Sequence, residues 1–291
     1  MNENKALDLF GIKPIGDAIN TSVTKSFEGI EGFLKRVCAP ALEEVGLLLK
    51  DQVRQWRLNN ILQILQKAQG KMEFRDEQLQ IKAHPRVALS IIDNGSLSDN
   101  EEVQELWAGL FVSACTKDGQ DDENLIFVDL LKQLTVIEAK ILKYSCLGAR
   151  KVLHTNGLLT GDEYQITCEE LFGLTGIKDI HRLDRELDHL RSLELIGHGL
   201  GSGGFSSTDD SLTADISPTA LALNLYIKSQ GFNDEPVKFW ETGVITYQEL
   251  ESERQQKEKE EMERQNAERE QRRQEQLAKQ KAEKEAREKS N

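Results

Sequence analysis

The sequence lacks paired cysteines, long apolar runs and an export signal. Its four cysteines, at positions 38, 115, 146 and 168, lie far apart and form no CxxC pair, so they predict small core residues rather than disulfides or metal ligands. No window approaches 18 consecutive apolar residues, which argues against a membrane-spanning helix. The first residues, MNENKALDLFGIKPIG, have neither the cationic nor the apolar part of a secretory signal. We therefore expect a cytoplasmic protein.

Catalytic and nucleotide-binding motifs are also missing. The sequence contains no nucleophile elbow, HExxH, P-loop or kinase signature. GLGSGG at residues 199–204 matches GxGxxG, but a polar run follows it where a dinucleotide-binding fold requires a helix. We expect this glycine-rich stretch to form a flexible hairpin tip. The sequence thus predicts no enzyme activity, no cofactor and no bound metal.

The sequence also lacks a surplus of positive charge, because it contains 50 acidic and 37 basic residues. Residues 249–291 hold 13 acidic and 12 basic residues, so the body of the chain carries −12 of the net −13. Affinity for nucleic acid comes mainly from Lys and Arg. The acidic body therefore disfavours a broad nucleic-acid surface.

Residues 15–37 predict an amphipathic helix. Its apolar side chains are Ile15, Ile19, Val23, Phe27, Ile30, Phe33, Leu34 and Val37. Such a face indicates a helix that docks on the core or one that lies on a membrane surface. Docking is favoured, because membrane-surface helices usually have a polar face rich in Lys or Arg, and this one does not.

A longer amphipathic helix is predicted for residues 41–68, directly after Pro40. Its apolar positions at spacings of three and four are Leu42, Val45, Leu49, Val53 and Trp56. The next two positions on this stripe are Asn60 and Ile64, so an amide interrupts the apolar face. A buried amide costs stability unless it is hydrogen-bonded, and Asn60 is therefore predicted to have a specific partner.

The rest of an N-terminal helical region, residues 1–134, has weaker signals. The short apolar run 86–92 fits either a helix or a strand. Ser98 and Glu101 have the spacing of a capping box, which predicts a helix that continues to about Ala114. A loop and a short helix at 125–134 complete the region.

A second domain is predicted for residues 135–231. Capping-box patterns at Thr135 with Glu138 and at Thr167 with Glu170 indicate two helix starts. Residues 179–193 then predict a helix with apolar residues at spacings of three and four.

The end of this domain predicts a β-hairpin and a last helix. The stretch LELIGHGLGSGGFSSTDDSLTADI indicates a strand, a glycine-rich tip and a second strand, and Ser217 before Pro218 indicates an N-cap. The order helix, helix–turn–helix, hairpin, helix resembles the winged-helix domains of bacterial regulators.

Residues 232–248 predict a linker, and residues 249–291 predict a charged helix with repeated Glu→Lys or Glu→Arg pairs at i,i+4. This tail has no sustained apolar seam, so we expect a solvated single helix rather than a coiled coil. The predicted fold class is mainly α: an N-terminal multi-helix domain, a winged-helix-like α+β domain and a long charged helix.

If the winged-helix-like domain binds DNA, the helix at 179–193 would read it. Its candidate contacts are Lys178, Arg182 and Arg185. Residues 178–194 nevertheless hold five acidic and four basic residues, whereas a DNA-reading surface usually has a positive surplus. A protein contact or a structural role is favoured over DNA binding.

Three groups of residues resemble motifs of the abortive infection alpha (Abi-alpha) family. They are Pro40, Glu44, Gly46, Leu49, Asp51, Trp56, Arg57, Asn60 and Lys67; then Glu101, Glu105, Leu106, Trp107, Ala108 and Leu110; then Phe127, Leu131, Leu134 and Glu138. The similarity covers roughly residues 35–230. It implies a role in bacterial defence against phage, in which the infected cell stops growing or dies before progeny emerge. It implies no catalytic residues.

Two interpretations remain open for the first two motifs. Arg57 and Asn60 are three residues apart and adjacent on a helix, so with Trp107 they form either a structural network or a partner-binding face. The full candidate set is Glu44, Asp51, Trp56, Arg57, Asn60 and Trp107. The leading hypothesis is a non-enzymatic abortive-infection protein that acts through a protein partner. The alternatives are a winged-helix transcriptional regulator and a membrane-active effector that uses residues 15–37, although we do not expect a membrane partner.

Overall fold

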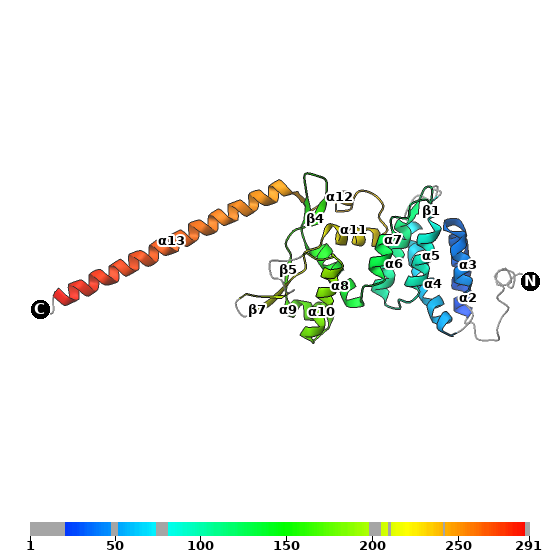
Figure 1. Cartoon of the computed structure of the whole chain (residues 1–291), viewed down its shortest axis with the longest axis horizontal. Helices are drawn as coiled ribbons and strands as arrows, with labels where there is room; N and C mark the ends of the chain where they lie inside the picture. The colour runs from blue at the N-terminus through cyan, green and yellow to red at the C-terminus, as the bar shows by residue number, and fades with distance from the viewer. Residues whose placement is uncertain are drawn as a thin grey trace, which may run out of the picture.

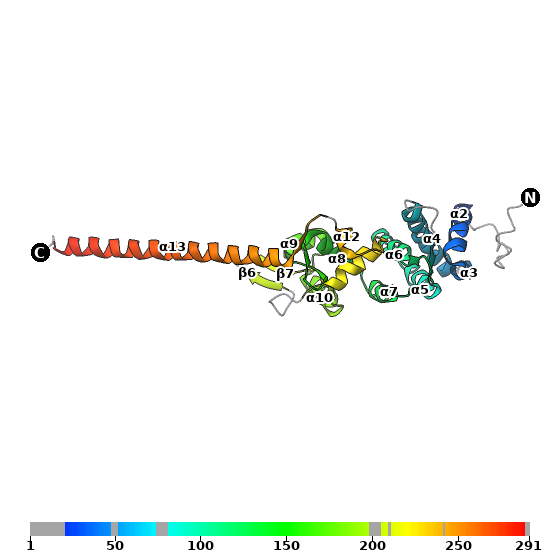
Figure 2. The ribbon, with the colours of Figure 1, turned by 90° about the horizontal axis from the view of Figure 1, so that it is seen from above.

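The computed structural model describes residues 21–47, 52–73, 81–197, 205–208, 211–240 and 242–288. The molecule is elongated, with helices at the N-terminal end, a mixed α and β part in the middle, and one long helix, α13 (Tyr247–Glu288), that extends away from the body (Figures 1 and 2). Small sheets accompany the helices in the middle part. The predicted mainly α class is confirmed.

The N-terminal part packs around two helices, α4 and α6. Its helices are α2 (Thr21–Val37), α3 (Ala39–Leu47), α4 (Gln52–Glu73), α5 (Pro85–Gly95), α6 (Glu101–Ser113) and α7 (Leu125–Leu131). The ambiguous run 86–92 is helical, within α5. A two-residue ladder pairs β1 (Lys82–Ala83) with β2 (Cys115–Thr116). Trp107 and Phe111 of α6 are among the largest fully buried side chains of the core.

The predicted helix at 41–68 is described as two helices, α3 and α4, with residues 48–51 outside the described residues. The prediction that Trp56 lies on the apolar side is wrong, because its side chain is 40% exposed. The side chains that α4 buries are Leu58, Asn60, Ile61, Leu62, Ile64, Leu65 and Ala68. Asn60 thus lies in the core, where its amide requires a partner.

The apolar face of α2, where its burial is described, lies against the protein. Ile30, Leu34 and Val37 are buried, and α2 packs against α3 and α4. For residues 21–37 this arrangement agrees with the docking-helix interpretation, whereas the rest of the predicted segment, residues 15–20, lies outside the described residues. Among the described residues, no helix is both long enough and apolar enough to span a membrane.

The N-terminal caps of the helices show which local sequence patterns predicted the structure correctly. The capping boxes of Thr135 with Glu138 and of Thr167 with Glu170 are both present, at the starts of α8 (Val136–Gly148) and α9 (Cys168–Thr175). The predicted box at Ser98 is wrong, because Asn100 caps α6 and accepts hydrogen bonds from the backbone N–H groups of its first turn. The predicted N-cap Ser217 is also wrong, because Thr219 caps α11 (Ala220–Ser229).

The predicted order helix, helix–turn–helix, hairpin, helix is present between α8 and α11, with α10 (Ile180–Ser192) as the third helix. The described hairpin pairs β6 (Phe205–Thr208) with β7 (Ser211–Asp215). The first strand predicted from LELIG is wrong, because residues 193–197 form a turn and one isolated bridge from Ile196 to Pro218. The predicted glycine-rich tip at 199–204 lies outside the described residues. The strand β5 (Gln165–Thr167) completes a sheet in the order β5-β7-β6. The resemblance to winged-helix domains stays a prediction.

Residues 232–248, predicted as a linker, contain ordered structure. They include the short helix α12 (Pro236–Phe239) and the strand β8 (Val244–Thr246), which pairs in parallel with β3 (Lys151–Leu153). On its other edge β3 pairs with β4 (Leu159–Gly161). The ring of Trp240 stacks on Tyr226 of α11 at 5.9 Å and lies 4.0 Å from the Lys151 ammonium. This segment therefore packs on the body and carries the chain to the base of α13.

Candidate functional site

Four residues fasten the turn between α5 and α6 to α4. Arg57 donates from Nε to Ser96 Oγ at 2.9 Å and from Nη2 to the Asp93 carboxylate at 2.6 Å. Asn60 donates from Nδ2 to the Ser96 carbonyl at 2.9 Å. We call Arg57, Asn60, Asp93 and Ser96 the turn clamp. The clamp supplies the partner that the buried Asn60 amide requires.

Trp107 holds the same turn from the side of α6. Its ring is buried, and its indole Nε1 donates to Ser98 Oγ at 3.2 Å. A methyl group at Gly95 would lie 3.2 Å from the Ile64 side chain and 3.3 Å from the Trp107 ring, so α4, the turn and α6 are in close contact. Trp107, Arg57 and Asn60 therefore converge on one turn, although they come from two separate motifs.

Lys67 and Glu105, which also belong to those motifs, join α4 to α6 by ion pairs. Lys67 Nζ lies 2.7 Å from Glu105 Oε1, and Lys71 Nζ lies 3.0 Å from Glu105 Oε2. Burial raises the pKa of Glu105, but hydrogen bonds from the two lysines outweigh it and hold this pKa below its ordinary value. An open polar hollow of about 430 Å³ lies beside these pairs. It is lined by Gln63, Gln66, Lys67, Asp99, Glu101 and Gln104.

The lowered pKa of Glu105 predicts a pH-dependent contribution to stability. The pairs stabilise the fold above the ordinary pKa of a glutamate, and their contribution disappears as pH falls through the lower folded-state value. We expect Glu105→Gln to cost about 0.5 kcal/mol at pH 7, since part-exposed ion pairs are screened, and to cost less at pH 3, where protonation of Glu105 weakens the pairs. Urea unfolding at both pH values measures this. The control is Glu43→Gln on the exposed side of α3; an equal loss at both pH values for Glu105→Gln would contradict the prediction.

Two exposed apolar side chains are sequence neighbours of turn-clamp residues. Trp56 precedes Arg57 on α4 and is 40% exposed, and Leu97 follows Ser96 in the turn and is 56% exposed. Single exposed apolar residues are ordinary. These two come from elements that the clamp fastens together, so the clamp fixes where both are presented. Ser96 and Leu97 were missed from the sequence, because a turn has no periodic signal, and Asp93 in the last turn of α5 was missed because its partner Arg57 is 36 residues away.

The other predicted residues are more dispersed. Glu44 is partly exposed on α3, and Asp51 lies outside the described residues. Lys178, Arg182 and Arg185 are exposed at and before α10, and Arg182 Nε lies 3.5 Å from Glu186 Oε1 on the same helix. This α10 surface thus shows charges of both signs.

Comparison with known proteins identifies the family of this chain. The family model described as abortive infection alpha matches residues 56–234, which is more than half of the chain. The matched region starts at Trp56 and includes the turn clamp, Trp107 and the segment from α8 to α11. No curated protein and no solved structure matches the chain.

Proposed function

Because the chain belongs to the abortive infection alpha family, we propose that it limits phage by binding a protein partner, without catalysis, through the surface at the turn clamp. The family suggests abortive-infection defence. The contact surface is our inference from the geometry of Trp56 and Leu97.

The polar residues of the motifs support a framework role. Arg57 and Asn60 make their hydrogen bonds to the turn between α5 and α6, and Trp107 is buried against it. A buried side chain cannot itself meet a partner. What this framework presents outward is Trp56 and Leu97, and exposed Trp residues at fixed positions are frequent binding hot spots.

The proposal predicts a loss of defence without a loss of stability. We expect Trp56→Ala combined with Leu97→Ala to abolish the reduction of phage burst size, since truncation of a hot-spot residue costs about 2 kcal/mol or more of binding energy. The urea midpoint should change less than for a fully buried residue, because Trp56 and Leu97 are 40% and 56% exposed. Burst size in cells that express each variant, with a stability measurement on the purified protein, tests this.

The matched control is Ile126→Ala on α7, an apolar side chain that is 58% exposed and belongs to another element. It should leave defence intact. Full protection by a stable Trp56→Ala, Leu97→Ala variant would remove this surface from the mechanism. Loss of protection in the Ile126→Ala variant would show that defence responds to exposed apolar residues in general.

A further inference from the structure

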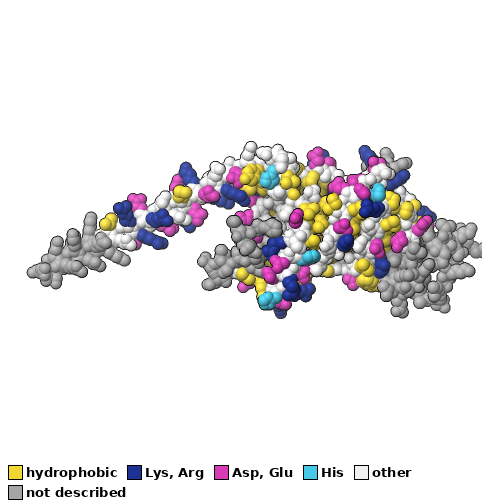
Figure 3. All heavy atoms as spheres, viewed as in Figure 1, with side chains coloured by type: hydrophobic (Ala, Val, Ile, Leu, Met, Phe, Trp, Pro, Cys, Tyr) yellow, Lys and Arg dark blue, Asp and Glu magenta, His cyan; other side chains and the backbone are white. Residues whose placement is uncertain are grey.

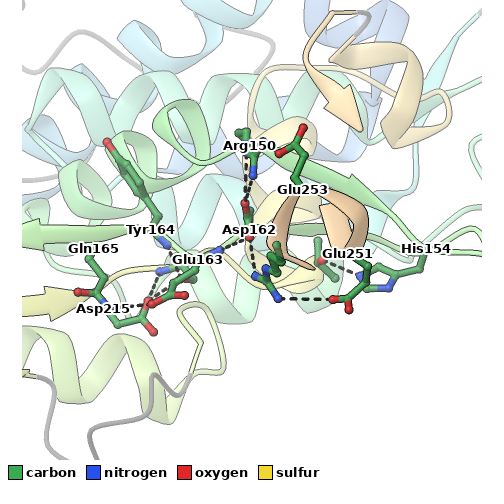
Figure 4. A network of polar contacts seen from close by, with 12 residues as sticks. Arg150, His154, Asp162, Glu163, Tyr164, Gln165, Asp215, Glu251 and Glu253 are labelled. Carbon is green, nitrogen blue, oxygen red and sulfur yellow. Dashed lines mark hydrogen bonds and ion pairs between the residues drawn. The ribbon is translucent and has the colours of Figure 1, made fainter. Parts of the chain in front are cut away.

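The base of α13 is fixed to the body by ion pairs. Arg150, between α8 and β3, lies 2.7 Å from Asp162 and 2.8 Å from Glu253 of α13. Arg254 of α13 also lies 3.0 Å from Asp162. Figure 4 shows Asp162 and Glu253 around Arg150. The ring of Tyr247 also stacks on His154 at 5.2 Å. These contacts give α13 a defined direction away from the body (Figure 2).

Beyond this base, the described side chains of α13 are exposed to solvent. All side chains from residue 252 to residue 277 are exposed, and Figure 3 shows that part of α13 covered with Lys, Arg, Asp and Glu side chains among which a few hydrophobic ones lie singly. Residues 252–277 extend over about 39 Å, at 1.5 Å per residue. They therefore offer a long accessible surface.

The charges on this helix are separated along its axis. Residues 249–263 contain seven acidic and three basic residues, whereas residues 264–288 contain eight basic and six acidic ones. The i,i+4 pairs that stabilise a lone helix do not require this separation. The helix dipole favours acidic residues at the start and basic ones at the end, but its influence is confined to the first and last turns. The separation extends over many turns, so it calls for another explanation.

Two large apolar side chains interrupt the charged surface. Met262 is 62% exposed and Leu277 is 50% exposed. They are about 22 Å apart along the axis and about 60° apart around it, given the rise and the 3.6 residues per turn of an α-helix. Both therefore lie on the same side of α13, one in each charge segment.

We propose that α13 pairs antiparallel with the α13 of a second copy of this chain, so that Met262 of each copy meets Leu277 of the other. In this register the acidic near part of each helix lies along the basic far part of the other. A parallel pair would instead place acidic residues against acidic ones.

The charge of the body favours the same arrangement. Each body carries a net charge of −12, so two bodies repel each other when they are close. An antiparallel pair of α13 helices holds the two bodies at opposite ends of the pair, at a distance far beyond the Debye length of about 8 Å at physiological salt. Because exposed ion pairs are individually weak and the apolar contacts are few, the dimer is weak, dependent on concentration and sensitive to salt.

Engineered cysteines in the full chain test both the pairing and its direction. Met262→Cys and Leu277→Cys are prepared as separate variants and exposed to a mild oxidant, alone and as an equal mixture. The antiparallel register predicts a dimer disulfide in the mixture and at least tenfold less in either variant alone. Raising salt from 50 to 500 mM should reduce the yield in the mixture. Wild type measures the background from the native cysteines, of which three are buried and Cys168 is partly exposed.

A cysteine at Gln271 is the matched control, because this position lies about 180° around the helix from Met262. It should cross-link to neither variant. Sedimentation of the wild-type chain at about 100 μM and 50 mM salt should show dimers that Met262→Glu with Leu277→Glu removes. Equal or stronger cross-linking within each single variant would establish a parallel pair and overturn the proposal. A monomer under all these conditions would overturn it as well.

Discussion

Alanine at Gly109 is expected to destabilise the protein by about 3 kcal/mol or more, at the upper end of what overpacking costs. Gly109 lies on α6 where α11 ends, and a Cβ atom there would lie 1.6 Å from the carbonyl oxygen of Ser229 and 2.3 Å from its carbon. Both are backbone atoms, so no side-chain rotation can relieve the clash. One of the two helices must move, and the core that α6 shares with α4 would be disturbed with it.

Urea unfolding of Gly109→Ala beside Gly29→Ala measures this effect. Gly29 is an exposed glycine in α2 with nothing within 4 Å of the added methyl, so alanine there should stabilise the protein by about 0.5–1 kcal/mol. The two substitutions are chemically identical and differ only in their surroundings. If Gly109→Ala were as stable as wild type, α6 and α11 could not be packed as closely as the structure places them.

Gly109 also shows how closely the two predicted domains are joined. It belongs to the region predicted as residues 1–134, and Ser229 belongs to the region predicted as residues 135–231. Gly231, with a φ of +82°, continues this contact, since a methyl group there would lie 3.0 Å from Val112. Capping boxes and composition locate the boundary between segments along the chain, but they carry no information on how tightly the segments pack.

The features that were predicted correctly from the sequence involve residues that are close together along the chain. The capping box of Thr135 with Glu138 involves residues three apart, and its pattern predicts its geometry directly. The spacing of Arg57 and Asn60 likewise places them side by side on one helix. Their partner Ser96 is 36 residues or more further along, in a turn, and no local pattern connects it to either of them.

Other features could not be predicted, because they depend on contacts between segments that are far apart in the sequence. Ser98 has the spacing of an N-cap, yet its hydroxyl accepts from Trp107 and Asn100 caps the helix instead. The strands β3 and β8 have three residues each, too few to show an alternating pattern, and they pair although about ninety residues separate them. For this reason the prediction of a linker at residues 232–248 did not include the strand β8.

Trp107→Ala is expected to cost about 3–5 kcal/mol, the range for removal of a large buried aromatic side chain. The ring is buried between α4, α6 and the α5–α6 turn, so its loss leaves a cavity against Gly95 and Ile64 and removes the hydrogen bond to Ser98. Trp107→Phe keeps most of the ring and removes the donor, and should cost about 1–3 kcal/mol for the truncated ring and the lost bond. Urea unfolding of both variants measures these differences, and a loss below about 1 kcal/mol for Trp107→Ala would contradict the burial of this ring.

The same two variants separate the framework from the contact surface. If Trp107 only positions the turn, Trp107→Phe remains folded and keeps its protection against phage, whereas Trp107→Ala loses protection together with stability. Trp56→Ala with Leu97→Ala should show the opposite combination, a stable protein without protection. A stably folded Trp107→Phe variant that no longer protects would mean that the shape of this turn itself is recognised. The partner surface would then include the turn between α5 and α6 as well as the two side chains beside it.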